Sequence, residues 1–268
     1  MTREDVLSDV AKEIAKDVYT DAGKAVMKPT GELIALVPRA VKAALLPLEQ
    51  WILQREFTIE KTRLLLEEKL KNVPPEQIQP PEPHVAVPAL QYLGYCLDNE
   101  ELRDMYANLL ANSMNTVVKN GVHPGFVEIV KQLCPDEAKI LRYLSIHKII
   151  PTITLRFDDE EGYGTDIVKH FSNVGELAKC EEPFDFKVYF DNMIRLGLLE
   201  SSPQLASMTD KSLYEPLKNH PKLHSEDIDI MRRAMGKNKA TFIEGYMKLT
   251  HYGHKFCDIC VSKTVLPE

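Results

Sequence analysis

Apolar residues near the start of the chain recur at helical spacing, with charged residues between them. Such spacing is typical of an amphipathic helix with one face turned to a core or a partner. Gly23 and the run from Pro29 to Gly31 then interrupt the pattern. We therefore predict one long amphipathic helix at the start of the chain. Its apolar positions are Val6, Leu7, Val10, Ala11, Ile14, Ala15 and Val18.

Residues 33–53 are strongly apolar, and Pro38 and Pro47 each suit the first turn of a helix. The segment is predicted to form either a buried helical hairpin or a surface that contacts a membrane or a partner after a trigger. Arg39 and Lys42 would each cost roughly 2.5–3.5 kcal/mol at a bilayer centre, which opposes permanent spanning but allows binding at the membrane surface. The residues expected to make such contacts are Leu33, Ile34, Leu36, Val37, Leu45, Leu46 and Trp51.

Residues 73–88 contain six prolines. This density is expected to exclude a helix and to favour an extended linker or a strap on the surface. It separates an N-terminal helical region, residues 1–72, from a central helical region, residues 89–134. In the central region Asp98 has a side chain suited to a helix N-cap, and Glu101 follows three residues later.

The pattern changes in the last block, residues 135–268. A helix opening at Pro135 is followed by an alternating strand pattern, two helices, and two further strands around a polar insertion at about residues 201–240. This order is typical of a winged helix, in which the loop between the strands is the wing. The predicted fold class is mainly α with a small β component: helical N-terminal and central regions plus a winged-helix-like C-terminal domain.

Winged helices often bind DNA through their third helix. Here that helix is expected over residues 186–196, and its charges, Asp185, Lys187, Asp191 and Arg195, are mixed. Direct base readout usually needs Arg, Lys, Asn or Gln at these positions. The pattern therefore favours protein contacts or simple packing over DNA binding.

A short basic run lies within the polar insertion. A run of this length is typical of a solvated loop, and the alternative is a site for an anionic partner, either nucleic acid or phospholipid. The residues concerned are Arg232, Arg233, Lys237 and Lys239.

His251, His254, Cys257 and Cys260 are spaced by three, and Cys257 and Cys260 are candidate zinc ligands. Zinc would make this a zinc-stapled domain or a zinc enzyme. Successive steps of three on an α-helix rotate side chains by about 60°, so four such residues cannot converge on one ion. A buried stripe that includes both cysteines is the favoured interpretation.

The remaining chemistry is sparse. The acidic run from Asp158 to Glu161 lacks the spacing of an EF-hand and is interpreted as a solvated loop. The sequence contains no nucleophile elbow, P-loop, dinucleotide fingerprint or metalloprotease motif. No catalytic or cofactor-binding residue, no metal and no cofactor is therefore predicted.

Charge and cysteine content narrow the class further. The net charge is −7, and residues 1–72, 73–134 and 135–268 carry 0, −4 and −3, so the acidity lies outside the N-terminal third. A net acidic chain opposes general nucleic-acid binding, which depends on clustered Lys and Arg. Five cysteines and no signal-peptide pattern predict a reducing cytoplasm, with peripheral association at the inner membrane as an alternative.

Four segments together resemble one protein family. They are PPEQIQPPEPHVAVPALQYLGYCLDNEELRDMYANLLANSMN, VHPGFVEIVKQLCPDEAKILRYL, NMIRLGLLES and LTHYGHKFCDIC. They resemble the abortive infection alpha family, a bacterial domain linked to phage defence, over roughly residues 60–262 and in matching order. Cys134 departs from the pattern, because the family more usually has Ser before Pro-Asp-Glu and Ser is the better N-cap.

The resemblance implies a bacterial antiphage component and assigns no catalytic residues. The residues add that it acts non-enzymatically, through protein or membrane contacts of its helical N-terminus. The expected partners are a protein or a phage-derived trigger, a membrane surface after activation, and a second copy of the chain. The alternative is a nucleic-acid-binding regulator that uses the third helix and the basic insertion.

Overall fold

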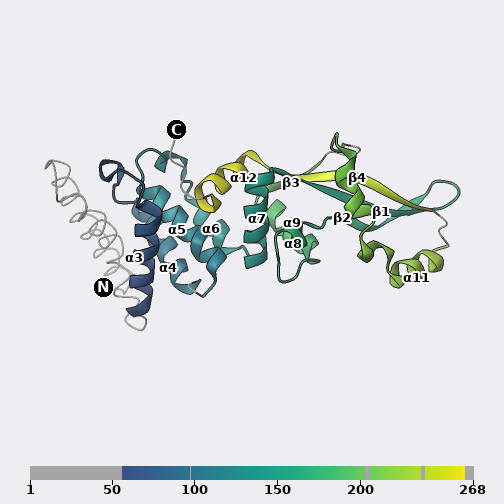
Figure 1. Cartoon of the computed structure of the whole chain (residues 1–268), viewed down its shortest axis with the longest axis horizontal. Helices are drawn as coiled ribbons and strands as arrows, with labels where there is room; N and C mark the ends of the chain where they lie inside the picture. The colour runs from purple at the N-terminus through teal and green to yellow at the C-terminus, as the bar shows by residue number, and fades with distance from the viewer. Residues whose placement is uncertain (1–55, 97, 203–205, 237–238, 263–268) are drawn as a thin grey trace, which may run out of the picture. The chain divides into compact units, whose positions relative to one another are not determined.

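The computed structural model describes residues 56–96, 98–202, 206–236 and 239–262. They divide into two compact units (Figure 1). The helical unit contains the described residues up to Leu133 together with those from Lys255 onwards, and the sheet unit runs from Cys134 to His254. The sheet unit is thus inserted, in sequence, between two parts of the helical unit.

The helical unit is built around helix α5 (Glu100–Met114), in which every residue from Met105 to Met114 is buried. α5 contacts α3 (Glu56–Leu70), α4 (Pro83–Tyr95), α6 (Gly125–Lys131) and the C-terminal π-helix η6 (Cys257–Val261). Asn99, not the predicted Asp98, is the N-cap of α5, because its Oδ1 accepts a hydrogen bond of 3.0 Å from the N–H of Leu102.

The proline-rich segment forms backbone hydrogen bonds with the rest of the helical unit. A short 3-10 turn, η2 (Pro75–Gln77), is followed by backbone hydrogen bonds of 2.8 Å from Gln79 to Met114 and from Thr116 to Gln77. The expectation that the prolines exclude a helix is wrong from Pro83 onwards, where α4 begins. Pro83 occupies the first turn, where no N–H is needed. α4 also tolerates Pro88 in its interior, since its apolar face is buried: Val85, Ala86, Ala89, Leu90 and Leu93.

The sheet unit contains a four-stranded antiparallel sheet in the order β2-β1-β4-β3. Its strands are β1 (Ile149–Asp158), β2 (Gly164–Phe171), β3 (Leu199–Ser201) and β4 (Lys239–Leu249). β1 and β4 pair along their length, from Ile149 opposite Lys248 to Asp158 opposite Lys239.

Short helices surround this sheet. α7 (Pro135–His147), η4 (Lys211–Tyr214) and α10 (Glu215–Lys218) pack on β1, and α9 (Phe186–Arg195) contacts β2 and β3. The other elements are η3 (Lys119–Gly121) in the helical unit, α8 (Val174–Leu177), η5 (Pro221–His224) and α11 (Glu226–Ala234) in the sheet unit, and α12 (His251–Phe256).

The predicted fold class is wrong. The chain has an α+β fold, and the part expected to be a winged helix carries a four-stranded sheet whose two central strands are 10 and 11 residues long. The sequence pattern missed β2 and the first half of β4. β2 buries only Phe171 and the first half of β4 buries no residue, so neither has the apolar alternation by which a half-buried strand is recognised. The two helices predicted after the first strand are confirmed as α8 and α9, the second of them close to its expected bounds of residues 186–196.

Candidate functional site

Two carboxylates are buried in the first turn of α7, Asp136 and Glu137. The helix begins here because Pro135 needs no N–H partner and because acids favour the positive end of a helix. Cys134 has no side-chain hydroxyl but still forms a capping box: its side chain accepts from the N–H of Glu137, and Glu137 Oε2 accepts a hydrogen bond of 2.7 Å from the N–H of Cys134. The Cys134 departure therefore leaves this helix start satisfied.

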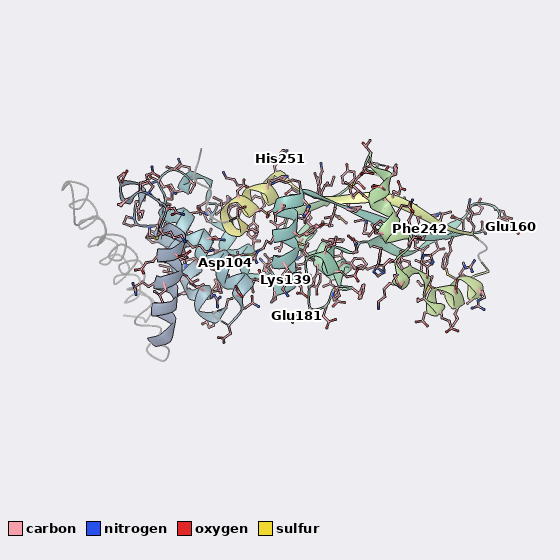
Figure 2. All side chains as sticks on the ribbon, viewed as in Figure 1. Asp104, Lys139, Glu160, Glu181, Phe242 and His251 are labelled. Carbon is pink, nitrogen blue, oxygen red and sulfur yellow. The ribbon has the colours of Figure 1, made fainter. Side chains whose placement is uncertain are left out.

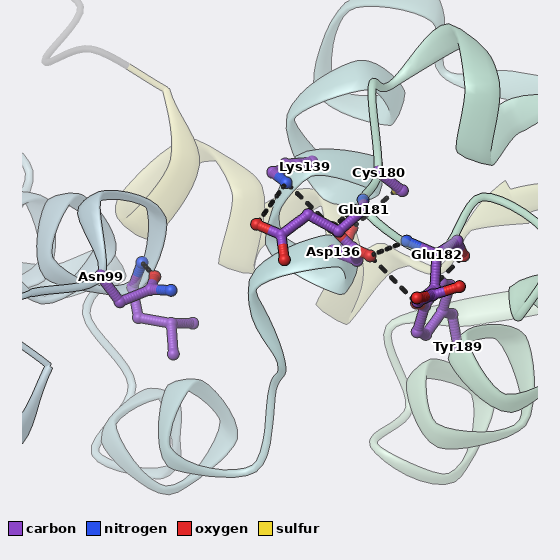
Figure 3. Close-up of polar contacts among 8 residues, drawn as sticks. Asn99, Asp136, Lys139, Cys180, Glu181, Glu182 and Tyr189 are labelled. Atoms are coloured by element: carbon purple, nitrogen blue, oxygen red, sulfur yellow. Dashed lines mark hydrogen bonds and ion pairs between the residues drawn. The ribbon is translucent and has the colours of Figure 1, made fainter.

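Asp136 accepts four hydrogen bonds from three parts of the sheet unit (Figure 3). Its Oδ1 accepts from the N–H of Glu181 and from Lys139 Nζ, both at 2.9 Å. Its Oδ2 accepts from the N–H of Glu182 at 3.0 Å and from the hydroxyl of Tyr189 at 3.1 Å. Each carboxylate oxygen thus has two donors, which fills the acceptor positions of the group.

These bonds set the charge state of Asp136. Burial by itself would raise its pKa, but the N–H groups of Glu182 and Glu181, with Lys139 and Tyr189, lower it to about 2. Burial and the bond to Asp136 raise the pKa of Tyr189, so its hydroxyl stays a donor. Asp136 is an ionised anchor with no position left for a substrate.

Glu137 ties α7 to α9 by a second route. Its Oε1 accepts a hydrogen bond of 2.8 Å from Asn192 Nδ2. Burial raises its pKa above the usual value, against the opposing effect of the hydrogen bonds from Cys134 and Asn192. Tyr189 and Asn192 therefore fix the inner side of α9 to two adjacent carboxylates, and α9 is held in a defined orientation.

The outer side of α9 combines apolar and charged side chains. We call it the α9 face. Val188 is 63% exposed, Ile194 is 40% exposed, and Phe184, just before the helix, is 37% exposed. At 100° per residue the five members within α9 lie within one arc of about 120°, and Phe184 precedes the helix in a turn. They are Phe184, Lys187, Val188, Asp191, Ile194 and Arg195.

The loop that carries Phe184 is held closely against α8. A Cβ on Gly175 would lie 2.2 Å from the carbonyl oxygen of Pro183, so only glycine fits there. Lys222 Nζ lies 4.4 Å from the centre of the Phe184 ring, within the range of a cation–π contact. Phe184 is therefore positioned by the close contact of Pro183 with α8 and by the Lys222 side chain over its ring.

The predicted basic residues lie on and after α11. Arg232 Nη2 is 3.1 Å from Asp229 Oδ1, and Arg233 Nε donates to the carbonyl oxygen of Asp229 at 3.2 Å. Lys239 begins β4 opposite Asp158. Lys237 is outside the described residues. Asp229 thus reduces the positive potential of Arg232, and Asp158 is the register partner of Lys239.

Asp158 belongs to the acidic run at the β1–β2 turn, where Figure 2 labels Glu160. Its Oδ1 accepts from Arg156 Nε at 2.8 Å and its Oδ2 from Thr241 Oγ1 at 2.6 Å. Arg156 Nη1 also lies 3.2 Å from Asp166 Oδ1. Asp158, the first residue of this acidic run, is thus engaged in an ion pair within β1 and in a hydrogen bond to β4.

The candidate zinc ligands Cys257 and Cys260 are buried in η6. Burial raises the pKa of the Cys260 thiol well above its ordinary value. They lie on a π-helix, not on the α-helix assumed from the sequence. Among the residues that the structure describes, no group of three His, Cys, Asp or Glu side chains is arranged to hold a metal ion.

The predicted membrane or partner contacts lie outside the described residues: Leu33, Ile34, Leu36, Val37, Leu45, Leu46 and Trp51. Within the ranges that are described, no helix is both long and apolar enough to cross a bilayer.

The sequence reasoning identified the mixed charges of α9 but missed its apolar exposed positions and its anchor. Val188, Asp191 and Ile194 are spaced by three, which was the available signal for one shared face. The helix opening at Pro135 was predicted, and the two acids that follow it lie in its first turn. These two carboxylates also accept hydrogen bonds from residues more than 40 positions away, and no local sequence pattern indicates such contacts.

Comparison with known proteins gives one family. The description abortive infection alpha matches residues 54–260. A search among curated proteins finds no match. Among solved structures, an uncharacterized protein from the marine bacterium Alcanivorax borkumensis SK2 is similar, with 16% identity and a TM-score of 0.37, over 51% of this chain and 92% of that one. Because the family match spans most of the chain, this protein belongs to the abortive infection alpha family.

Proposed function

We propose that this chain is an abortive-infection component that works through protein contacts, and that the α9 face receives a phage-derived protein trigger. The family name supports a role in abortive infection. The α9 face supports the contact: it exposes Phe184, Val188 and Ile194 among charges of both signs. Exposed apolar side chains within a polar rim are typical of protein interfaces.

The anchoring of α9 supports the same proposal. Tyr189 and Asn192 attach the inner side of α9 to α7 through hydrogen bonds to Asp136 and Glu137. A helix fixed in this way loses little conformational freedom when a partner binds, so more of the contact energy appears as affinity. Two cations and one acid on the face do not make the basic surface that a phosphate backbone needs.

A change of Val188 to Asp tests the proposal in bacteria that carry this gene and are challenged with phage. We expect Val188→Asp to abolish protection, so that plaque counts rise to those of cells without the gene. Ile146→Asp is the matched control, because Ile146 is also exposed, at 71%, but belongs to the last turn of α7 and not to this face. Full protection by Val188→Asp, at equal protein abundance, would contradict the proposal.

The effector step is proposed for the N-terminal helical region. The trigger would release this region, which then disturbs a membrane or a host partner through the apolar segment 33–53. Cell fractionation with and without infection, together with liposome leakage, measures this step. Leakage or membrane recovery only after infection would support it, and no membrane association in either state would contradict it.

Nucleic acid is the competing partner and would use the basic residues at the end of α11. Gel shifts at low salt with Arg232→Glu plus Arg233→Glu distinguish the two. Salt-sensitive binding that this double variant removes would favour nucleic acid. Unchanged mobility of DNA and RNA at all protein concentrations is expected if the partner is a protein.

A further inference from the structure

Helix α11 is the most exposed helix of the sheet unit that is long enough to pair with another helix. It has nine residues, begins after Ser225, and contains no buried residue. It lies at the end of this unit opposite α7 (Figure 1). Ile230 is 52% exposed and Met231 is 45% exposed, and Met235, which ends the helix, is 40% exposed.

The apolar side chains of α11 lie on one side of the helix. Ile228, Met231 and Met235 follow the spacing i, i+3 and i+7, and Ile230 and Ala234 are four residues apart beside them. Ile228 is half-buried and the other four are exposed, and Asp227 lies within the same arc. We call these five residues the α11 face. An apolar helical face that its own unit leaves exposed is stabilised when a second surface covers it.

The charges of α11 are segregated along its axis. Glu226, Asp227 and Asp229 lie in the first half, and Arg232 and Arg233 lie in the last turn. This order is also the one that a single helix favours, because the acids lie at its positive end and the bases at its negative end. It leaves two exposed ends of opposite sign on either side of an apolar centre.

We propose that the α11 face pairs with the same face of a second copy of this chain, with the two helices antiparallel. A two-fold axis near Ile230 would place the acidic half of each helix beside the basic half of the other. Glu226 would then lie near Arg233 of the second copy, and the symmetric pair would form at the other edge. Such an isologous contact is self-complementary in both charge and apolar surface.

An anionic membrane fits this helix less well. Three acids outnumber two bases on α11, and both arginines already bond to Asp229. A lipid headgroup would meet the acidic half as well as the basic half. A second copy of the helix satisfies both halves at once.

The pairing is independent of the α9 face and goes beyond the proposed trigger contact. Two nine-residue helices bury less than the roughly 1,200 Å² of a standard interface, so the dimer is expected to be weak and to depend on concentration. Sedimentation velocity of the full chain over a wide range of concentrations, at low and high salt, measures it directly.

Charge exchange is the decisive variant series. Arg233→Glu or Glu226→Arg alone places like charges opposite each other and should weaken dimerisation about tenfold. The double variant Glu226→Arg plus Arg233→Glu restores opposite charges only in an antiparallel pair, and its dissociation constant should return to within about threefold of wild type. Met231→Asp should abolish the dimer by removing an apolar contact, independently of the charge pairs.

Glu161→Arg is the matched control, because it makes the same charge change at an exposed position of the β1–β2 turn. It should leave the dimer unchanged, and circular dichroism should show that every variant is folded. A chain that stays monomeric at all concentrations would overturn the proposal. So would a dimer that Met231→Asp and Arg233→Glu leave intact, or an α11 that binds anionic phosphatidylglycerol vesicles without dimerising.

Discussion

Asp136 illustrates how much a single side chain can organise. It accepts bonds from the backbone of a loop, from Lys139 on its own helix and from Tyr189 on α9. A carboxylate with these donors is far more stable ionised than protonated, which is why its pKa falls to about 2. The side chain therefore contributes to stability only while it is charged.

We expect Asp136→Asn to lower the free energy of unfolding by about 2 kcal/mol at pH 7, the value that a pKa shift of this size implies. Because the folded pKa lies below the unfolded one, the contribution is complete above about pH 4 and is lost as the pH falls towards 2. Urea unfolding at pH 7 and at pH 3 measures the difference.

The difference in the free energy of unfolding between wild type and Asp136→Asn should therefore be smaller at pH 3 than at pH 7. Glu181→Gln is the control, because Glu181 is exposed and its carboxylate lies 3.9 Å from Lys139. It should change stability little, as surface ion pairs usually do. An equal loss for Asp136→Asn at both pH values would show that its charge is not the cause.

At the scale of elements, α5 connects distant parts of the chain through side-chain amides. Asn112 Nδ2 donates to the carbonyl oxygen of Ile259 at 2.7 Å, and Asn108 Nδ2 donates to that of Cys260 at 2.9 Å. Asn108 and Asn112 are one helical turn apart, and both are buried. They hold η6, which follows them by almost 150 residues, against the centre of the helical unit.

Replacing Asn112 with Ala should lower the free energy of unfolding by about 1–3 kcal/mol, because a buried carbonyl then loses its donor. Chemical denaturation followed by circular dichroism gives the value. Gln132→Ala removes a similar amide bond, from Nε2 to the carbonyl oxygen of Glu128 at 2.9 Å, but at an exposed site. A loss for Asn112→Ala no greater than for Gln132→Ala would mean that the bond to Ile259 contributes little.

At the scale of the whole molecule, the two units differ in how their chain segments are arranged. The sheet unit is continuous from Cys134 to His254, and all four strands come from within that range. The helical unit needs the residues from Lys255 onwards, because α5 packs against η6. The two units are therefore expected to differ when they are separated.

A fragment of residues 134–254 should fold by itself and unfold in one cooperative transition. A fragment of residues 54–133 should be much less stable, since it lacks η6 and leaves Asn108 and Asn112 without their carbonyl partners. Thermal melts followed by circular dichroism compare them. Cooperative unfolding of the helical fragment at the temperature of the full chain would contradict this view of η6.

The family and several helices could be predicted from the sequence, since they depend on local pattern. Pro135 marked the start of α7, and the helix expected over residues 186–196 is α9. The sheet could not be predicted in full, because β2 buries only Phe171 and so lacks alternation. The α9 face shows the same limit, because the carboxylates that orient it are far from it in sequence.

The discontinuous helical unit has a consequence for synthesis on the ribosome. Domains usually fold as they emerge, the N-terminal one first. Here the sheet unit is complete as soon as His254 has left the exit tunnel, whereas the helical unit still lacks η6. Its core can close only after η6 has also emerged, so α3 to α6, although they are translated before the sheet unit, are expected to become native after it.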